Sequence, residues 1–170
     1  MRIQGQRFEI APVGEDELGR ILDVYCQCAD FLALGPEPTA SQAMVVADLQ
    51  HSRQEGGVFC GIIDSEGEMI GVVDFVPAGF GGDPRQAFFS LLMIAPPHRN
   101  RGLGAEAVRL VEEAIGSDAQ VECILSAVQV NNPAGIRFWQ RNGYAIVGGP
   151  ERQPDQTTVY RLRKAVRERR

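Results

Sequence analysis

Apolar residues recur along the chain with two kinds of spacing, and these spacings predict its strands and helices. Over residues 15–30, Leu18, Ile21, Leu22 and Tyr25 follow one another at the three- and four-residue intervals of one helix face. The predicted elements in chain order are a strand at 7–13, helices at 15–30 and 39–51, strands at 58–64, 68–76 and 87–94, a helix at 102–115, a strand at 121–130, a helix at 132–142, and strands at 144–147 and 157–162. This order predicts one mixed-sheet domain of the α/β (α+β) class, without internal repeats.

Turn-forming residues separate these elements. Ser65-Glu66-Gly67 lies between two strand-like runs and predicts an antiparallel hairpin. Thr39 or Ser41 can cap the second helix, and Asn132 before a proline marks the start of a later one. The run at 87–94 is almost wholly apolar, which is typical of a central strand buried on both faces.

The composition is that of a folded domain. The chain has 170 residues and a mass of 18.6 kDa, with 44% hydrophobic and 23% charged residues. We therefore expect residues 1–170 to form a single domain. No apolar run approaches the ~20 residues that cross a bilayer, and residues 1–8 lack the apolar segment of a signal peptide. These two observations favour a cytoplasmic protein with no membrane partner.

Charge is unevenly distributed along the chain. The 17 basic and 22 acidic residues give a net charge of −5. Six basic residues and one acid lie in 161–170, so the first 160 residues hold 11 basic and 21 acidic residues, a net of −10. An acidic body argues against nucleic acid as the main partner, because phosphate neutralisation needs a basic face. The basic tail at about 163–170 is either a solvated end or an anion-binding segment.

Cysteines and histidines do not form a metal-binding pattern. The four cysteines (Cys26, Cys28, Cys60 and Cys123) include no C-x-x-C pair, and neither His51 nor His98 has metal-ligand spacing from a cysteine. We expect no metal site and free thiols.

One segment combines the features of a phosphate site. After the apolar strand at 87–94 come Arg99, Arg101, Gly102 and Gly104, and then a helix. The first N–H groups of a helix lack internal partners, and glycine lets a phosphate approach the backbone closely. The segment therefore predicts a phosphate or pyrophosphate site. The alternative is that the glycines only permit a tight turn.

A dinucleotide fingerprint is the competing interpretation of the same glycines. Gly102, Gly104 and Ala107 fit G-x-G-x-x-G/A, and Glu122 follows at a suitable distance. That fingerprint places its first glycine directly after the strand, whereas residues 95–101 intervene here. No Walker loop and no G-x-S-x-G motif is present.

Two blocks resemble one known family. Arg99-x-x-Gly102-x-Gly104 resembles the R/Q-x-x-G-x-G/A motif of the GNAT superfamily of N-acetyltransferases. The block from Asn132 to Tyr144 resembles the later N-x-x-A-x-x-x-Y-x-x-x-G-F signature of that superfamily. The resemblance implies a mostly antiparallel sheet of about seven strands with about four helices. It also implies that the fourth and fifth predicted strands splay apart.

The resemblance further implies acetyl-CoA as the cofactor. The N–H groups of the segment 99–105 would hold its pyrophosphate, and the backbone of 92–94 would pair with the pantetheine arm and polarise the thioester carbonyl. Asn132 is either a plain helix cap or a cofactor contact, and Phe138 packs either on the pantetheine or in the core. The residues assigned to the cofactor are Leu92, Met93, Ile94, Arg99, Asn100, Arg101, Gly102, Leu103, Gly104, Ala105, Asn132, Gly135 and Phe138.

The chain departs from the family pattern at its acid and its base. Trp139 stands where the family often has a tyrosine acid, and its indole is no useful acid at neutral pH. The strand at 87–94 carries no glutamate to deprotonate the amine. The remaining candidates are Asp74, Glu122, and Ser90 acting through water. The alternative for Asp74 is a place on the exposed face of a half-buried strand.

These observations predict an acyl-CoA-dependent N-acyltransferase that attacks the thioester directly with a primary amine of a small molecule or peptide. The alternative is a non-catalytic acyl-CoA-binding sensor or scaffold. Because the family is often dimeric, a homodimer is one expected assembly. We expect acceptor contacts from the segments 29–39 and 77–84, where Asp30, Glu37 and Asp83 lie.

Overall fold

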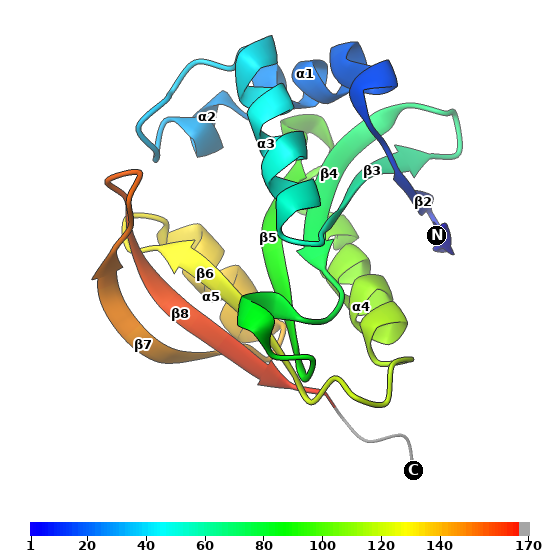
Figure 1. The fold of residues 1–170 in the computed structure, drawn as a ribbon. Coiled ribbons are helices and arrows are strands. Elements are labelled where there is room, and N and C mark those ends of the chain that lie inside the picture. The colour runs from blue at the N-terminus through cyan, green and yellow to red at the C-terminus, as the bar shows by residue number, and fades with distance from the viewer. Residues whose placement is uncertain (167–170) are drawn as a thin grey trace.

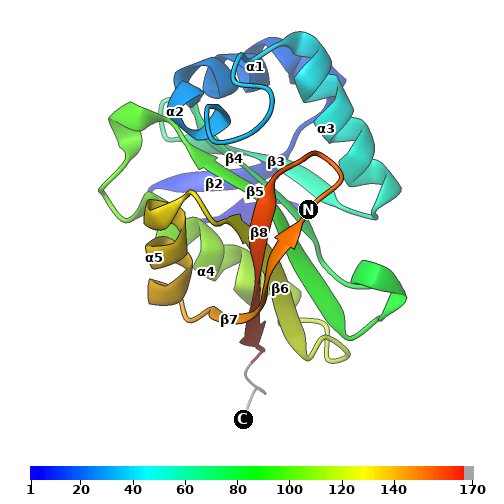
Figure 2. The same ribbon diagram turned by 90° about the vertical axis from the view of Figure 1, so that its left-hand side faces the viewer.

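One eight-stranded sheet runs through the molecule in the order β1-β2-β3-β4-β5-β6-β8-β7 (Figures 1 and 2). The computed structural model describes residues 1–166. The strands are β1 (Ile3–Gln4), β2 (Phe8–Pro12), β3 (Val58–Asp64), β4 (Met69–Val76), β5 (Gln86–Ile94), β6 (Cys123–Gln129), β7 (Ala145–Arg152) and β8 (Thr158–Ala165). The helices are α1 (Leu18–Gln27), α2 (Ala29–Leu32), α3 (Gln42–Gln54), α4 (Leu103–Ile115) and α5 (Pro133–Arg141). The predicted mixed and mostly antiparallel sheet is confirmed, with the short β1 as an additional strand.

Helices cover both faces of the sheet (Figures 1 and 2). On one face, Ile21 of α1 and Leu49 of α3 belong to a buried cluster that includes Val72 of β4. On the other face, Val111 of α4 packs in a second cluster with Val73, the next residue of β4. Neighbouring residues of a strand point to opposite faces, so β4 is buried along its whole length.

The fully buried central strand is β4, and not the 87–94 run for which the sequence predicted it. In β5, which contains that run, Ser90 is exposed and its two neighbours on the C-terminal side are partly exposed. The physical reason is that β6 pairs with only the first part of β5.

Caps and breaks define where the helices lie. Ser41 Oγ accepts a hydrogen bond from the N–H of Met44 at 3.1 Å, so α3 begins after Ser41. The predicted helix at 15–30 is divided into a 3-10 turn, α1 and α2, because Cys28 leaves the helical region at φ −94° and ψ 33°. The break sets the short α2 apart from α1 (Figure 1).

The C-terminal hairpin is longer than the sequence pattern predicts. β7 continues past Gly148 to Arg152 because its pairing with β8 resumes after two register shifts. The first part of the predicted basic tail belongs to β8, where Lys164 pairs with Glu112 at 2.7 Å. Residues 167–170 of that tail lie outside the described residues. None of the described helices has the length and apolar character needed to span a membrane.

Candidate active site

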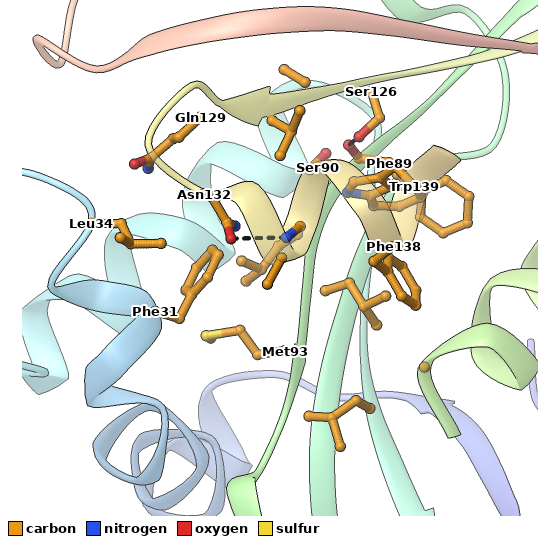
Figure 3. Close-up of a pocket in the computed structure, with 18 of the residues that line it drawn as sticks. Phe31, Leu34, Phe89, Ser90, Met93, Ser126, Gln129, Asn132, Phe138 and Trp139 are labelled. Atoms are coloured by element: carbon orange, nitrogen blue, oxygen red, sulfur yellow. Dashed lines mark hydrogen bonds between the residues drawn. The ribbon is translucent and has the colours of Figure 1, made fainter. Parts of the chain in front are cut away.

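A cavity opens where two neighbouring strands separate. β5 and β6 are parallel and pair only from Gln86↔Cys123 to Phe89↔Ser126. Beyond these pairs lies a cavity of about 1160 Å³, lined by both strands, by the starts of α4 and α5, and by the β7–β8 loop (Figure 3). A space of this size accommodates an extended organic ligand. These are the two strands for which the sequence resemblance predicted a splay.

The edge of β5 presents unpaired backbone groups to this gap. The N–H of Ala95 donates to the carbonyl of Ile70 on β4 at 2.8 Å. Pairing alternates along an antiparallel ladder, so Met93 also turns its backbone toward β4, whereas Leu92 and Ile94 turn theirs toward the gap. The carbonyl oxygen of Ile94 already accepts the Nε–H of Arg99 at 2.7 Å. An extended ligand could therefore pair with the N–H groups of Leu92 and Ile94 and with the carbonyl of Leu92.

The segment after β5 offers a continuous row of amide hydrogens. Gly102 caps α4 in the left-handed region at φ +77°, and Asn100 is left-handed at φ +60°. Among residues 1–166, no acceptor contacts the N–H groups from Asn100 to Ala105. The N–H of Arg99 differs, because it donates to Pro96 at 3.2 Å. Free amides at the positive end of a helix suit a phosphate group.

The two predicted arginines differ in their surroundings. Both terminal nitrogens of Arg99 contact the carboxylate of Asp30, at 2.5 and 3.1 Å. Arg101 is exposed and is not among the residues that line the cavity. The Arg99 guanidinium is therefore already engaged by a carboxylate, whereas the expected attraction of Arg101 for a pyrophosphate stays a prediction.

The start of α5 forms the opposite wall of the cavity. Asn132 Oδ1 accepts the N–H of Gly135 at 2.9 Å, so Asn132 is a helix cap that also lines the cavity. Gly135 has no room for a Cβ, which would overlap the Asn132 side chain. Gly104 lets α4 approach Phe138, whose ring would lie 3.2 Å from a Cβ there. Gly104, Gly135 and Phe138 line the cavity.

Trp139 is packed and is not poised for proton transfer. It is 8% exposed, and its ring meets those of Phe89 and Tyr144 with centroids 5.4 and 4.9 Å away. Phe138 is partly buried against the same cluster, so it both joins the core and faces the cavity.

The three predicted proton acceptors lie in three different environments. Ser90 lines the cavity and is exposed there (Figure 3). Asp74 is 5% exposed, does not line the cavity and accepts a 2.6 Å hydrogen bond from the Ser52 hydroxyl. Burial raises the pKa of the Asp74 carboxyl, and the Ser52 hydrogen bond lowers it in part. Glu122 precedes β6 and lies about 13 Å along the strand from Ser126, the first residue of β6 to line the cavity, so its position does not favour a catalytic role.

Several cavity-lining residues carry no motif in the sequence. The helix α3 contributes His51. The turn at α2 contributes Phe31 and Leu34, and the end of β6 contributes Gln129 (Figure 3). The β7–β8 loop adds Asp155. Of the predicted acceptor segments, 29–39 reaches the cavity, whereas Asp83 in 77–84 instead binds Arg85 at 3.0 Å. Glu37 does not line the cavity either. Within residues 1–166, no cluster of three or more potential metal ligands is found.

Known proteins resemble this chain both in sequence and in fold. A family model described as Acetyltransferase (GNAT) family matches residues 21–144. Among curated proteins, none matches the sequence. An acetyltransferase from Thermus thermophilus shares 22% identity at a TM-score of 0.76, over 97% of this chain and 99% of that one.

Two further solved structures show the same fold. A spermidine N-acetyltransferase from Vibrio cholerae, in complex with CoA and spermine, has 15% identity and a TM-score of 0.71, covering 95% of this chain and 97% of its own. A Salmonella typhimurium acetyltransferase that modifies the N-terminal serine of ribosomal protein L7/L12 has 13% identity and a TM-score of 0.78, covering 98% of this chain and 100% of its own. Because the family model spans most of the sequence and the fold agrees along nearly all of it, this chain belongs to the GNAT family of acetyltransferases.

Proposed function

We propose that this chain transfers an acetyl group from acetyl-CoA to a primary amine, in the gap between β5 and β6. One observation carries the proposal. The row of free N–H groups from Asn100 to Ala105 lies beside the open edge of β5, and both border the same cavity. Such a row suits a diphosphate, and such an edge suits an extended amide-bearing arm.

Acetyl-CoA fits the residues present. The amides of 100–105 would hold its diphosphate, and Gly102 and Gly104 keep that surface clear of side chains. The backbone of Leu92 and Ile94 would pair with the pantetheine arm, with Phe138 on the opposite wall. When bound, the cofactor supplies an acetyl thioester whose carbonyl carbon bonds to the amine nitrogen as its C–S bond breaks.

The chain assists at the carbonyl through its backbone. An N–H on the open edge of β5, from Leu92 or Ile94, would donate to the carbonyl oxygen as negative charge develops there. Removing one such donor typically slows acyl transfer about 10²–10³-fold. This donor is held by the β4–β5 ladder, so it needs no rearrangement before it acts.

The amine must lose a proton, because alkylamines titrate near ~10.4. His51 lines the cavity, and histidine is the side chain that ordinarily accepts a proton near neutral pH. We assign the proton to His51, directly or through a water held by Ser90, which lines the same cavity. The thiolate leaves without help from Trp139, since thiols are acidic enough, at a pKa near ~8.5, to leave as anions.

The acceptor substrate is a primary amine attached to a partly apolar molecule. Phe31, Leu34 and Val159 line the cavity, as does Asp155. The similar Vibrio cholerae enzyme is named for a polyamine, and the Salmonella typhimurium enzyme modifies a protein N-terminus; both acceptors are amines. A carboxylate among the lining residues attracts an ammonium group, and apolar neighbours favour a carbon-rich body.

Calorimetry with acetyl-CoA tests the cofactor site. The variant Gly102→Glu places a carboxylate in the amide row and should abolish binding. Gly19→Glu adds the same charge on the exposed side of α1, where a Cβ meets nothing within 4 Å, and should bind as wild type does. Equal binding by wild type and Gly102→Glu would contradict the assignment of this segment.

Release of CoA thiol, followed with a panel of amines, tests turnover. The panel contains spermidine, a serine-initiated peptide, free amino acids and an aminoglycoside. Steady thiol release with at least one amine supports the transferase. Tight acetyl-CoA binding without release from any of them would instead favour the non-catalytic sensor.

A further inference from the structure

An ion pair joins two segments that border the cavity from different sides. The carboxylate of Asp30 in α2 accepts hydrogen bonds from both terminal nitrogens of Arg99, at 2.5 and 3.1 Å. Two parallel bonds of this kind are the strongest geometry for an arginine and a carboxylate. The Nε–H of the same guanidinium donates to the carbonyl of Ile94 at 2.7 Å. Arg99 therefore connects α2 to the end of β5.

The segment that Asp30 belongs to is only partly packed against the core. No residue of α2 is fully buried, and its Phe31 and Leu32 pack only partly against the cluster that contains Ile21 and Leu49. Phe31 and Leu34, which we call the acceptor-side wall, nevertheless line the cavity (Figure 3). The Leu34 carbonyl accepts one hydrogen bond from Asn131 at 3.2 Å. The ion pair thus adds a two-point polar contact with the end of the site to this partial packing and this single hydrogen bond.

We propose that Asp30 and Arg99 are positioning residues that hold the acceptor-side wall against the end of β5 and the cofactor segment. The proposal rests on the proposed function. It assigns to these two residues the placement of the wall against which the amine substrate binds. Neither residue needs to touch the reacting atoms. Arg99 acts on the edge of β5 through Ile94, and Asp30 acts on the wall through α2.

Two other roles for these residues make different predictions. Asp30 could contact the ammonium group of the acceptor directly, and Arg99 could contact the diphosphate. The geometry favours positioning, because both oxygens of Asp30 and all three kinds of nitrogen in Arg99 already have protein partners. The Arg99 guanidinium also holds the pKa of the Asp30 carboxyl below its usual value, so the pair is charged at neutral pH.

The first test separates the three roles by Michaelis constants. Asp30→Asn and Arg99→Gln should each raise the KM for the best amine of the panel about fivefold, with kcat and the acetyl-CoA KM within twofold of wild type. The double variant should be no worse than either single one, because both changes remove one interaction. Asp30→Glu, which keeps the charge, should recover part of the loss.

Each competing role has its own outcome. If Asp30 binds the ammonium group, Arg99→Gln frees it and lowers the amine KM. If Arg99 binds the diphosphate, Arg99→Gln raises the acetyl-CoA KM and Asp30→Asn does not. Either result would overturn the proposal. The control pair is Arg109→Gln and Glu113→Gln, which breaks the exposed 2.6 Å ion pair on α4 and should change neither constant.

The second test needs no acceptor and no turnover. Hydrogen–deuterium exchange of the amides at 28–35 should be about fivefold faster in Asp30→Asn and in Arg99→Gln than in wild type, and unchanged in the control pair. Unchanged exchange in both variants would overturn the positioning role. Calorimetry with acetyl-CoA on the same samples shows separately whether the cofactor site itself is intact, so failure of the proposed function is distinguishable.

Discussion

The hydroxyl of Ser126 donates a hydrogen bond to the main-chain oxygen of Phe89 across 3.0 Å, at the last residue pair before β5 and β6 separate. Ser126 is 4% exposed, so the bond lies inside the protein. It ties the two strands together at the inner end of the cavity, and it is made by one of only three buried polar or charged residues found within 1–166.

We expect Ser126→Ala to lower the free energy of unfolding by about 1–2 kcal/mol, because the buried Phe89 oxygen loses its side-chain partner. Urea unfolding followed by circular dichroism measures this loss. The comparison variant Ser117→Ala removes a 2.7 Å bond to Ala114 at an exposed helix end and should cost less than about 0.5 kcal/mol. Equal losses for the two variants would argue that the Ser126 bond has no special role at the gap.

Ala105→Glu should change stability and cofactor binding in opposite directions. Ala105 is exposed in the first turn of α4, where a carboxylate interacts favourably with the helix dipole and adds about 0.3–1 kcal/mol to stability. The same carboxylate would repel the diphosphate, so we expect the Kd for acetyl-CoA to rise more than tenfold. Thermal unfolding and calorimetry on one sample measure both effects, with Ala105→Gln as the neutral comparison. Unaltered binding would place the diphosphate elsewhere.

His51→Gln should lower kcat/KM at pH 7 by about 10²-fold, the lower end of what a positioned base contributes. The remaining rate should rise with pH as more of the free amine becomes neutral. Ser90→Ala should have a smaller effect on the rate, because a serine only orders the water that carries the proton. A pH–rate profile of His51→Gln identical to that of wild type would remove His51 from the mechanism.

Asp74→Asn tests a structural role for the residue that the sequence put forward as a base. Burial raises the pKa of the Asp74 carboxyl, so its folded pKa lies above the unfolded value near ~3.9. The neutral form is the one that folding favours. Its contribution is complete at low pH and is lost as the pH rises through the folded pKa. Relative to wild type, Asp74→Asn should therefore gain stability as the pH rises above about 4, while its pH–rate profile stays that of wild type. Denaturant unfolding at several pH values measures the trend, and a pH-independent difference would contradict it.

Local patterns were sufficient to predict most elements of this fold. The cap at Ser41 and the Asn132-Pro133 helix start appear where the sequence indicated them, because each depends on residues close together in the chain. The break at Cys28 was missed, since apolar spacing continues across it. The extension of β7 was also missed, because pairing with β8 carries the strand across two glycines that resemble a turn in the sequence.

The site was less predictable because its contacts are distant in the chain. Arg99 was expected to face a phosphate from its local motif, and only the folded chain brings Asp30, 69 residues earlier, against its guanidinium. His51 carries no motif, and it belongs to α3, which packs over β3 and β4, far along the chain from most of the other residues that line the cavity. The buried state of Asp74 follows from the α3 layer above it, through Ser52.

The parallel orientation of β5 and β6 explains why the gap between them has a positive electrostatic potential at one end. β5 and β6 are the one parallel pair within residues 1–166, so they point the same way, and α4 and α5 begin where these two strands end. Two helix starts, each carrying about half a positive charge, consequently face one opening in a chain whose net charge is −5. If β6 were antiparallel to β5, α5 would begin at the opposite edge of the sheet. The attraction for an anion would then be divided between the two ends of the strands.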